Sequence, residues 1–263
     1  MNNCVVTEDF KERLGGGAFG FVFKGMLEDD NQIVAKRFSG ITLPCLNCQA
    51  WKKIILHIAK GLAYLHEECR QRIIHLNIKP QNILLDEDFN VKISDFELYK
   101  LINREESHVL TTMRGTPGYI GPEWWQARVT IKTDIYSFRI VLLEIVSRWR
   151  NIDSTQLESR KHLLQVLREK AEYQLIDIVE NMDEGVKQYH AKEVVRMTKI
   201  GAWCLQNDQS KRPFMSIVVK VLQGWMEVET NINYNFTYAM ASSSTINNHA
   251  SMAPPALVLS NPQ

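Results

Sequence analysis

The sequence predicts an α+β fold in which strands come first and helices follow. Within the first forty residues, FGFVFKGML at 19–27 places three phenylalanines on one face of an extended segment, which is the period of a β-strand. From Trp51 onwards, apolar side chains recur every three or four residues, which is the period of an amphipathic helix. Since 45% of the residues are hydrophobic, the chain has enough apolar surface for a buried core.

The predicted elements follow one another along the chain. After the strand at 19–27, the turn residues EDDNQ lead into a second strand, IVAKRF at 33–38. The first helix is expected from Trp51 to near Glu68, and its apolar face carries Ile54, Ile55, Ile58, Leu62 and Leu65. A short hairpin then joins ILL at 83–85 to VKI at 91–93. Further helices are expected near 133–148, 160–170, 192–206 and 214–228.

The two changes of pattern divide the chain into three segments. The strands occupy 1–50, and most of the helices occupy 51–229. At 230–263 the chain is rich in Asn, Ser and Pro and has no apolar period, so we expect a disordered tail.

Composition and charge exclude several classes of protein. The chain has 31 Lys plus Arg against 30 Asp plus Glu, a net charge of +1, which does not favour binding to nucleic acid or to an anionic membrane. No apolar run approaches the roughly eighteen residues needed to cross a bilayer, and the N-terminal MNNCVVTEDFKERL lacks the apolar core of a signal peptide. We therefore expect a cytoplasmic chain without a membrane span.

The five cysteines, at positions 4, 45, 48, 69 and 204, are too few and too scattered for a disulfide scaffold. Cys45 and Cys48 form a CxxC pair, but no second pair follows at the spacing of a zinc site. We expect reduced, incidental cysteines.

A glycine-rich stretch near the N-terminus suggests a phosphate site. Gly15, Gly17 and Gly20 form a GxGxxG pattern followed by Val22, and such a loop lets backbone N–H groups approach a phosphate. The pattern lies between two strands, unlike the strand–turn–helix setting of a dinucleotide site, and Lys36 on the next strand is placed to meet phosphates. Considered alone, the same residues also fit an ordinary hairpin turn and a solvated lysine.

Further motifs follow in a fixed order: HLNIKPQN at 75–82, ISDFE at 93–97, RGTPGYIGPE at 114–123, DIYSF at 134–138 and KRP at 211–213. Together with the glycine-rich loop they resemble the signature set of protein kinases, from residue 10 to about 228. GLAYLHEEC, HVLTTMRGT and WCLQ are similar to phrases in plant receptor-like serine/threonine kinases of the lectin and S-receptor-like type. The resemblance implies a bilobal kinase fold, with a reduced β lobe at 1–50 and a helical lobe at 51–229.

The resemblance also implies ATP and Mg²⁺ as cofactors and a protein as substrate. It places magnesium on Asn82 and Asp95, the α- and β-phosphates near Lys36, and the transferred phosphoryl group near Lys79. The implied phosphate loop consists of Gly15, Gly17 and Gly20, and the implied adenine pocket consists of Leu14, Val22, Ala35 and Leu84.

Three structural tasks follow from the same resemblance. Glu123 is expected to pair with Arg212, and Asp134 is expected to tie the catalytic loop to a central helix. His75 is expected to pack and not to carry protons.

Asn77 departs from the family pattern because it occupies the place of the catalytic aspartate. An amide can position a hydroxyl group but cannot accept its proton. Loss of a positioned general base typically costs about 100-fold to 10,000-fold in rate.

A block of chain is missing between Lys36 and His75. Only 38 residues separate them, whereas kinases usually place at least about twice that number between these motifs. The family uses this block for a helix whose glutamate pairs with the lysine, for two more strands and for the hinge that binds adenine. No Asp or Glu occurs between Arg37 and His66, so no local acid replaces that glutamate. A three-stranded sheet without its covering helix is expected to be marginal in water.

Three further positions depart from the pattern. Glu97 stands where a glycine usually follows Asp95 and Phe96, and it either attracts a cation or points to solvent. Arg139 replaces a glycine of the central helix, where a long charged side chain needs an exit to water. Leu76 replaces the arginine with which many kinases hold a phosphorylated activation loop.

Three readings of function remain open from the sequence. The retained Lys36, Lys79, Asn82 and Asp95 favour an active serine/threonine kinase. The losses favour a catalytically impaired pseudokinase that docks a partner, such as another kinase, or is itself phosphorylated on Ser107, Thr111, Thr112 and Thr116. The third reading is a non-functional truncated gene product. Sequencing the transcript across codons 37–55 tests the deletion, because recovery of an inserted acidic helix would remove it. The oligomeric state stays open.

Overall fold

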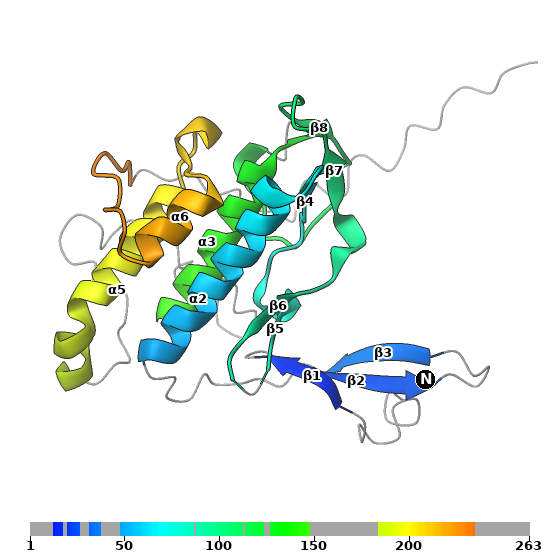
Figure 1. The fold of residues 1–263 in the computed structure, drawn as a ribbon, viewed down its shortest axis with the longest axis horizontal. Coiled ribbons are helices and arrows are strands. Elements are labelled where there is room, and N and C mark those ends of the chain that lie inside the picture. Colours follow the sequence, from blue (N-terminus) through cyan, green and yellow to red (C-terminus); the bar gives the residue numbers. More distant parts are fainter. Residues whose placement is uncertain are drawn as a thin grey trace, which may run out of the picture.

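The computed structural model describes residues 13–17, 20–26, 32–37, 48–86, 88–112, 114–123, 127–147 and 184–234. Within these ranges the longer helices lie together, and the strands lie to one side of them (Figure 1). The helices are α2 (Cys48–Ala63), α3 (Ile131–Ser147), α5 (Glu184–Cys204) and α6 (Met215–Leu222). The predicted α+β class is confirmed.

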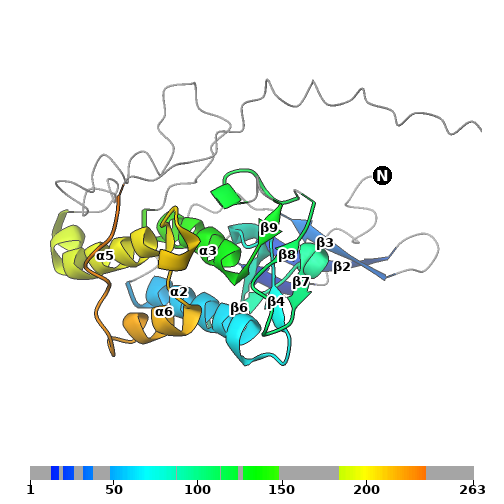
Figure 2. The ribbon, with the colours of Figure 1, turned by 90° about the horizontal axis from the view of Figure 1, so that it is seen from above.

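The helices form the main hydrophobic core. Helix α2 packs against α6 and α3, and α3 packs against α5, so that the helices form two adjacent pairs (Figure 2). Helix α3 is buried along nearly its whole length, which makes it the central helix. A side chain at Gly201 on α5 would meet the Leu143 side chain at 3.0 Å, which explains why α5 and α3 approach each other at a glycine.

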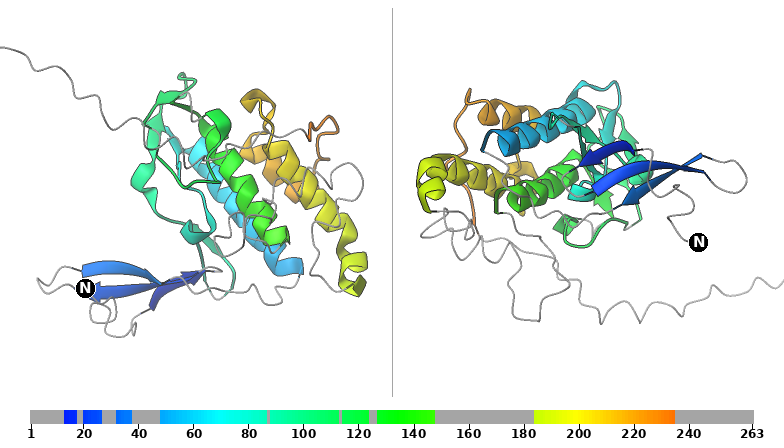
Figure 3. Two further views of the ribbon diagram at one scale, coloured as in Figure 1. Left: turned by 180° about the vertical axis from the view of Figure 1, so that it is seen from behind. Right: turned by 90° about the horizontal axis from the view of Figure 1, so that it is seen from below.

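The glycine-rich strands join the hairpin of the helical lobe in one five-stranded sheet, in the order β3-β2-β1-β5-β6. Strand β1 (Arg13–Gly17) pairs with β2 (Gly20–Met26), and β2 pairs with β3 (Gln32–Arg37). The other side of β1 pairs with β5 (Ile83–Leu85), through Gly16 and Leu85, and β5 pairs with β6 (Val91–Ile93). The three N-terminal strands are therefore part of a larger sheet. Strands β2 and β3 project away from the helices (Figures 1 and 3).

Two small two-stranded sheets position the loops of the helical lobe. Strand β4 (Arg72–Ile74) pairs with β7 (Lys100–Ile102), and β8 (Val109–Leu110) pairs with β9 (Arg128–Val129). A second, smaller core lies beneath them and contains Ile74, Leu76, Ile102, Val129 and Ile131.

The predicted bounds hold for the hairpin and closely for the first and central helices, but α5 begins at Glu184 and not near 192. Helix α2 continues into a π-helical turn, Tyr64–Glu68, and the hairpin at 83–85 and 91–93 has the predicted bounds. Helix α6 ends at Leu222 and not near 228, because Gly224 adopts a left-handed conformation with φ of 82°. The chain up to Tyr234 still packs on the core, beyond the boundary expected at 229. The helix expected at 160–170 and most of the predicted tail lie outside the described residues.

Glu67 caps the N-terminus of helix α6 from another part of the chain. Phe214, the residue that precedes the helix, has no side chain that can cap it. The Glu67 carboxylate instead accepts hydrogen bonds from the backbone N–H of Ser216, at 2.9 Å, and from the Ser216 hydroxyl. A carboxylate at this end also interacts favourably with the helix dipole. This contact ties α6 to the end of the first helix.

Replacing Glu67 with alanine is expected to lower the free energy of unfolding by about 1–2 kcal/mol, because the substitution leaves an N-terminal N–H without its carboxylate. Chemical denaturation measures this change. Glu68→Ala is the matched control, because Glu68 is exposed and next in sequence. Equal losses from both variants would contradict the capping role.

Candidate active site

The loop that begins at His75 is held by the buried carboxylate of Asp134 on α3. This carboxylate accepts hydrogen bonds from the backbone N–H of His75 at 2.7 Å and of Leu76 at 2.8 Å. It also contacts the Nε2 of His66 at 2.9 Å. Asp134 thus fixes the start of the loop on the central helix, as predicted.

His75 itself packs inside the fold. Its Nδ1 accepts a hydrogen bond from the backbone N–H of Asn77 at 3.2 Å, so its Nε2 carries the proton and donates to the carbonyl of Ser94 at 3.1 Å. Its ring lies 4.5 Å from that of Phe96, centroid to centroid. Burial lowers the pKa of His75, which favours the neutral form. These contacts fit the expected packing role.

The four residues predicted for catalysis lie together, and Thr116 joins them. Asn77 donates from its side-chain amide to a carboxylate oxygen of Asp95 at 3.3 Å. Thr116 donates its hydroxyl to the amide oxygen of Asn77 at 3.4 Å, and Lys79 donates to the Thr116 hydroxyl at 3.0 Å. Asn82 donates to the backbone carbonyl of Asn77 at 2.8 Å. Both ends of the Asn77 amide are therefore engaged inside the site.

Asn82 and Asp95 fit magnesium by the kind of their side chains, since Mg²⁺ binds oxygen ligands and usually shares one or two protein side chains with phosphates and water. In the part of the chain that the structure describes, no group of three His, Cys, Asp or Glu residues is placed to hold a metal ion. A cation here would rely on this pair, and one oxygen of Asp95 already accepts an N–H from Asn77.

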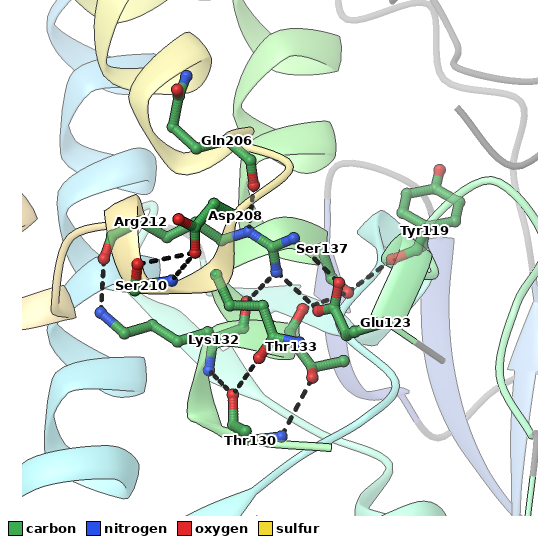
Figure 4. Close-up of polar contacts among 11 residues, drawn as sticks. Tyr119, Glu123, Thr130, Lys132, Thr133, Ser137, Gln206, Asp208, Ser210 and Arg212 are labelled. Atoms are coloured by element: carbon green, nitrogen blue, oxygen red, sulfur yellow. Dashed lines mark hydrogen bonds and ion pairs between the residues drawn. The ribbon is translucent and has the colours of Figure 1, made fainter. Parts of the chain in front are cut away.

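A salt bridge buried in the helical lobe supports the loop that contains Thr116. Arg212 donates to the two carboxylate oxygens of Glu123 at 2.6 and 2.9 Å (Figure 4). It also donates to the backbone carbonyls of Gln206 at 2.8 Å and of Lys132 at 3.0 Å. The predicted pairing of Glu123 with Arg212 is confirmed, and both side chains are almost wholly removed from water.

The combination of an Asp-anchored loop, an Asn–Asp pair and a buried Glu–Arg pair matches a known family. The family model for the protein kinase domain matches residues 43–223. The chain belongs to the protein kinase family.

Its relatives among known proteins are plant receptor-like kinases. The G-type lectin S-receptor-like serine/threonine-protein kinases SD2-5 and SD2-2 of Arabidopsis thaliana are 43% and 44% identical over 83% and 67% of this chain. LECRK3 of Oryza sativa subsp. indica, with the same family title, is 40% identical over 68% of the chain. The matches cover 34%, 23% and 22% of those proteins, so this chain spans about a third of their length or less. The predicted resemblance to plant receptor-like serine/threonine kinases is confirmed.

The glycines of the predicted phosphate loop and Lys36 lie on strands that pair with one another. Gly15 lies opposite Val22, Gly17 opposite Gly20, and Val22 opposite Lys36. Leu14 lies in β1 and Ala35 in β3, while Leu84 lies in β5 of the same sheet. The structure describes the backbone of β1–β3 but not their side chains, so the adenine and phosphate roles of these residues stay predictions.

A small pocket beside Asn77 brings in residues that the sequence did not single out. Tyr119 donates its hydroxyl to the buried carboxylate of Glu144, at 2.9–3.0 Å, and Ser137 donates to the Tyr119 carbonyl at 2.7 Å. These contacts connect the Thr116 loop to α3. The pocket is lined by Leu76, Asn77, Ile78, Thr116, Tyr119, Ile120 and Ser137.

The structure shows the surroundings of two residues that depart from the kinase pattern, Glu97 and Leu76. Glu97 is exposed and points to solvent, and it belongs to a one-turn helix, Phe96–Leu98. Leu76 is buried in the smaller core, so this position offers an apolar anchor where many kinases offer a cation. Its φ of 63° is uncommon for a residue with a side chain and is held by the Asp134 contact.

Arg139 on α3 is fully buried, and its guanidinium nitrogens have no hydrogen-bond partner among the described residues. The group lies 4.5 Å from the centre of the Tyr136 ring, and burial lowers its pKa to about 10. A long cation at this position was expected to need an exit to water, whereas the structure buries the side chain completely. Nearby, burial raises the pKa of the Cys204 thiol to about 12, so this cysteine stays protonated and unreactive.

Lys132 completes the polar cluster around Arg212. Its ammonium group donates to the Arg212 carbonyl at 2.5 Å and lies 3.8 Å from the centre of the Phe214 ring. Burial lowers the pKa of Lys132 from 10.5 to about 8. The folded protein therefore binds this proton less tightly than the unfolded chain does.

The lowered pKa of Lys132 predicts how the stability of the protein changes with pH. Below pH 8 the charged Lys132 lowers stability, and this penalty is relieved as the pH rises from about 8 towards 10.5. The free energy of unfolding should rise across this window in the native chain relative to Lys132→Met. Denaturation of both proteins at several pH values measures the difference. A difference that is constant from pH 7 to pH 10 would contradict the assignment.

No helix in the ranges that the structure describes combines the length and the apolar character needed to cross a membrane.

Proposed function

We propose that this kinase domain is catalytically impaired and serves as a protein-binding module. The observation that carries the proposal is the position of Asn77, whose amide lies in the catalytic loop between Asp95 and Thr116. An amide at this position cannot take the proton of a substrate hydroxyl, and this proton transfer is one contribution to the rate.

The topology of the sheet supports weak capture of ATP. In the predicted adenine pocket, Leu84 lies on one face of the adenine ring and Leu14, Val22 and Ala35 lie on the other. The two groups of side chains must then be about 7 Å apart, so that each makes van der Waals contact with the ring. Strand β1 instead pairs directly with β5 through Gly16 and Leu85. Neighbouring strands lie side by side at about 4.8 Å, so their residues do not face one another across a ring.

The phosphate site has a further weakness. In an active kinase a glutamate pairs with the lysine that meets the phosphates. Between Arg37 and His66 this chain has no acidic residue, so Lys36 has no local acid to hold it. Loss of this pair and loss of the base affect separate steps, namely positioning of the phosphates and transfer of the proton.

The partner in this proposal is a protein, such as a substrate of another kinase or that kinase itself. The chain would act on the cytoplasmic side of a membrane, where receptor-like relatives carry their kinase domains. The exposed Ser107 and Thr112 and the half-buried Thr111 and Thr116 are the hydroxyl groups that a partner kinase would modify.

An active serine/threonine kinase is the second candidate. The contact of Lys79 with Thr116 at 3.0 Å and the retention of Asn82 and Asp95 favour it. These residues keep the arrangement that would serve phosphoryl transfer if ATP were held.

Thermal unfolding with ATP and MgCl₂ separates the two candidates. ATP at 100 times its dissociation constant would stabilise the fold by about 2.7 kcal/mol, which is a rise of several degrees in Tm. We expect a rise of less than about 1 °C at 1 mM ATP. Asp95→Asn is the control for binding at this site. A rise of several degrees that is lost in Asp95→Asn would overturn the proposal of weak capture.

A further inference from the structure

The three N-terminal strands carry charges of one sign only. Strands β1, β2 and β3 contain Arg13, Lys24, Lys36 and Arg37 and no acidic residue. The whole chain, by contrast, has a net charge of only +1. This part of the sheet is therefore locally basic, and its charge favours an acidic partner.

The register of the strands divides these residues between the two faces of the sheet. Directly opposed residues of an antiparallel pair share a face, and successive residues of a strand alternate between faces. Phe23 lies opposite Arg13 on one side and Ala35 on the other, and Phe21 lies opposite Arg37. The face that contains Phe23, which we call the Phe23 face, consists of Phe21, Phe23, Ile33, Ala35 and the two arginines, Arg13 and Arg37.

The basic residues Lys24 and Lys36 belong to the opposite face, because they lie opposite Val34 and Val22. The Phe23 face is thus the one that combines two aromatic residues with a basic residue on each outer strand. The same register puts Val22 and Ala35 on opposite faces, although the adenine prediction places both beside the ring.

The Phe23 face has about the dimensions of one helix. Neighbouring strands lie about 4.8 Å apart, so β1 and β3 are separated by about 10 Å, which is close to the diameter of an α-helix. The seven residues of β2 extend over about 23 Å, which a helix of about 15 residues matches. In the described ranges, β2 and β3 project away from the helices, and no helix packs extensively on them (Figures 1 and 3).

We propose that the Phe23 face docks an acidic amphipathic helix of a partner protein. The apolar stripe of that helix covers Phe21 and Phe23, and acidic residues on both sides of the stripe pair with Arg13 and Arg37. A layer of this kind is the usual way in which an apolar sheet face is buried. The inference rests on the proposed function, since it gives the protein-binding module one surface and one class of partner.

The test measures the binding of two labelled synthetic peptides by fluorescence anisotropy, without nucleotide. Each peptide has about 15 residues and a stripe of leucines at helical spacing. The acidic peptide carries Glu on both sides of the stripe, and the basic peptide carries Lys at the same positions. The native chain should bind the acidic peptide at least about 10-fold more tightly than the basic one.

Charge reversal on the two faces separates docking from general attraction. Arg37→Glu should weaken binding of the acidic peptide by about 10-fold and should strengthen binding of the basic peptide. Lys24→Glu changes the net charge equally but lies on the opposite face, so it should change either affinity by less than about 3-fold. If Arg37→Glu does not fold, Arg13→Glu takes its place, and the preference of the native chain already tests the charge of the face.

The apolar part of the contact has its own variant. Phe23→Thr keeps a residue that suits a strand, and it should weaken binding of the acidic peptide by about 10-fold. Met26→Thr on the opposite face is the matched control and should change the affinity by less than about 3-fold. Circular dichroism checks that each variant is folded.

Three outcomes would overturn the inference. The first is a native chain that binds neither peptide or binds both equally. The second is an equal effect of Arg37→Glu and Lys24→Glu. The third is tighter binding of oligothymidine, or of vesicles that contain phosphatidylserine, than of the acidic peptide. Because the assay contains no nucleotide, its failure removes this surface and this partner, whereas the impairment of catalysis is decided by thermal unfolding with ATP.

Discussion

Arg212→Ala is expected to lower the free energy of unfolding by about 3–5 kcal/mol. Arg212 is 1% exposed, and its guanidinium holds both oxygens of Glu123 and the carbonyls of Gln206 and Lys132. Its loss leaves a buried carboxylate without a counter-charge and two carbonyls without a donor. Because Glu123 follows Thr116 on the same stretch of chain, the loop beside the predicted catalytic residues should also lose order.

Urea denaturation at neutral pH measures this effect. Lys211→Ala is the matched control, because Lys211 is the exposed neighbour of Arg212 and its loss should change stability by less than about 0.5 kcal/mol. The double variant Arg212→Met/Glu123→Leu should be more stable than Arg212→Ala, since it leaves no unpaired buried charge. A loss below about 1 kcal/mol in Arg212→Ala would contradict the buried pair.

Arg139→Met is expected to raise the free energy of unfolding by about 1–3 kcal/mol. The substitution keeps an unbranched side chain of similar length and removes a buried cation whose contact in the described residues is the face of Tyr136. A cation–π contact contributes about 2 kcal/mol when desolvated, while the penalty for burying an ion is several kcal/mol. The removal of the charge should therefore outweigh the loss of the contact.

Thermal and urea unfolding of Arg139→Met measure the gain, and Arg128→Met is the control because Arg128 is exposed on β9. A stability gain confined to Arg139→Met would support the unfavourable burial. A loss of 1 kcal/mol or more would contradict it and would show that the guanidinium is well paired.

The sequence predicted what depends on local pattern or on short motifs. The period of three and four from Trp51 places the buried Ile54, Ile55 and Ile58 on one face of α2, and the hairpin around 86–90 has its predicted strands. The paired Glu123 and Arg212 lie 89 residues apart, and the resemblance to kinases predicted their contact, since no local signal connects such positions. The resemblance likewise predicted the contact between Asp134 and the loop that begins at His75.

The sequence did not predict contacts that depend on packing between distant segments. The pairing of Gly16 with Leu85 arises because β5 has an open edge beside β1, and periodicity says nothing about which edges meet. The cap of α6 by Glu67 and the pair of Tyr119 with Glu144 join residues 149 and 25 positions apart. Asn77 was recognised as a lost base, but its bond to Asp95 depends on the three-dimensional path of the loop.

Phosphoryl transfer by the chain itself is the most direct test of whether catalysis is impaired. The purified chain should be incubated with MgCl₂, γ-labelled ATP and a general protein substrate, beside Asn77→Asp and Asp95→Asn. Active kinases turn over about 1–100 times per second. We expect no incorporation above Asp95→Asn in the native chain, and in Asn77→Asp at least about 100-fold less than such turnover, because Lys36 still lacks its acid. Labelling by the native chain at about one turnover per second would contradict the loss of function at Asn77 and Lys36.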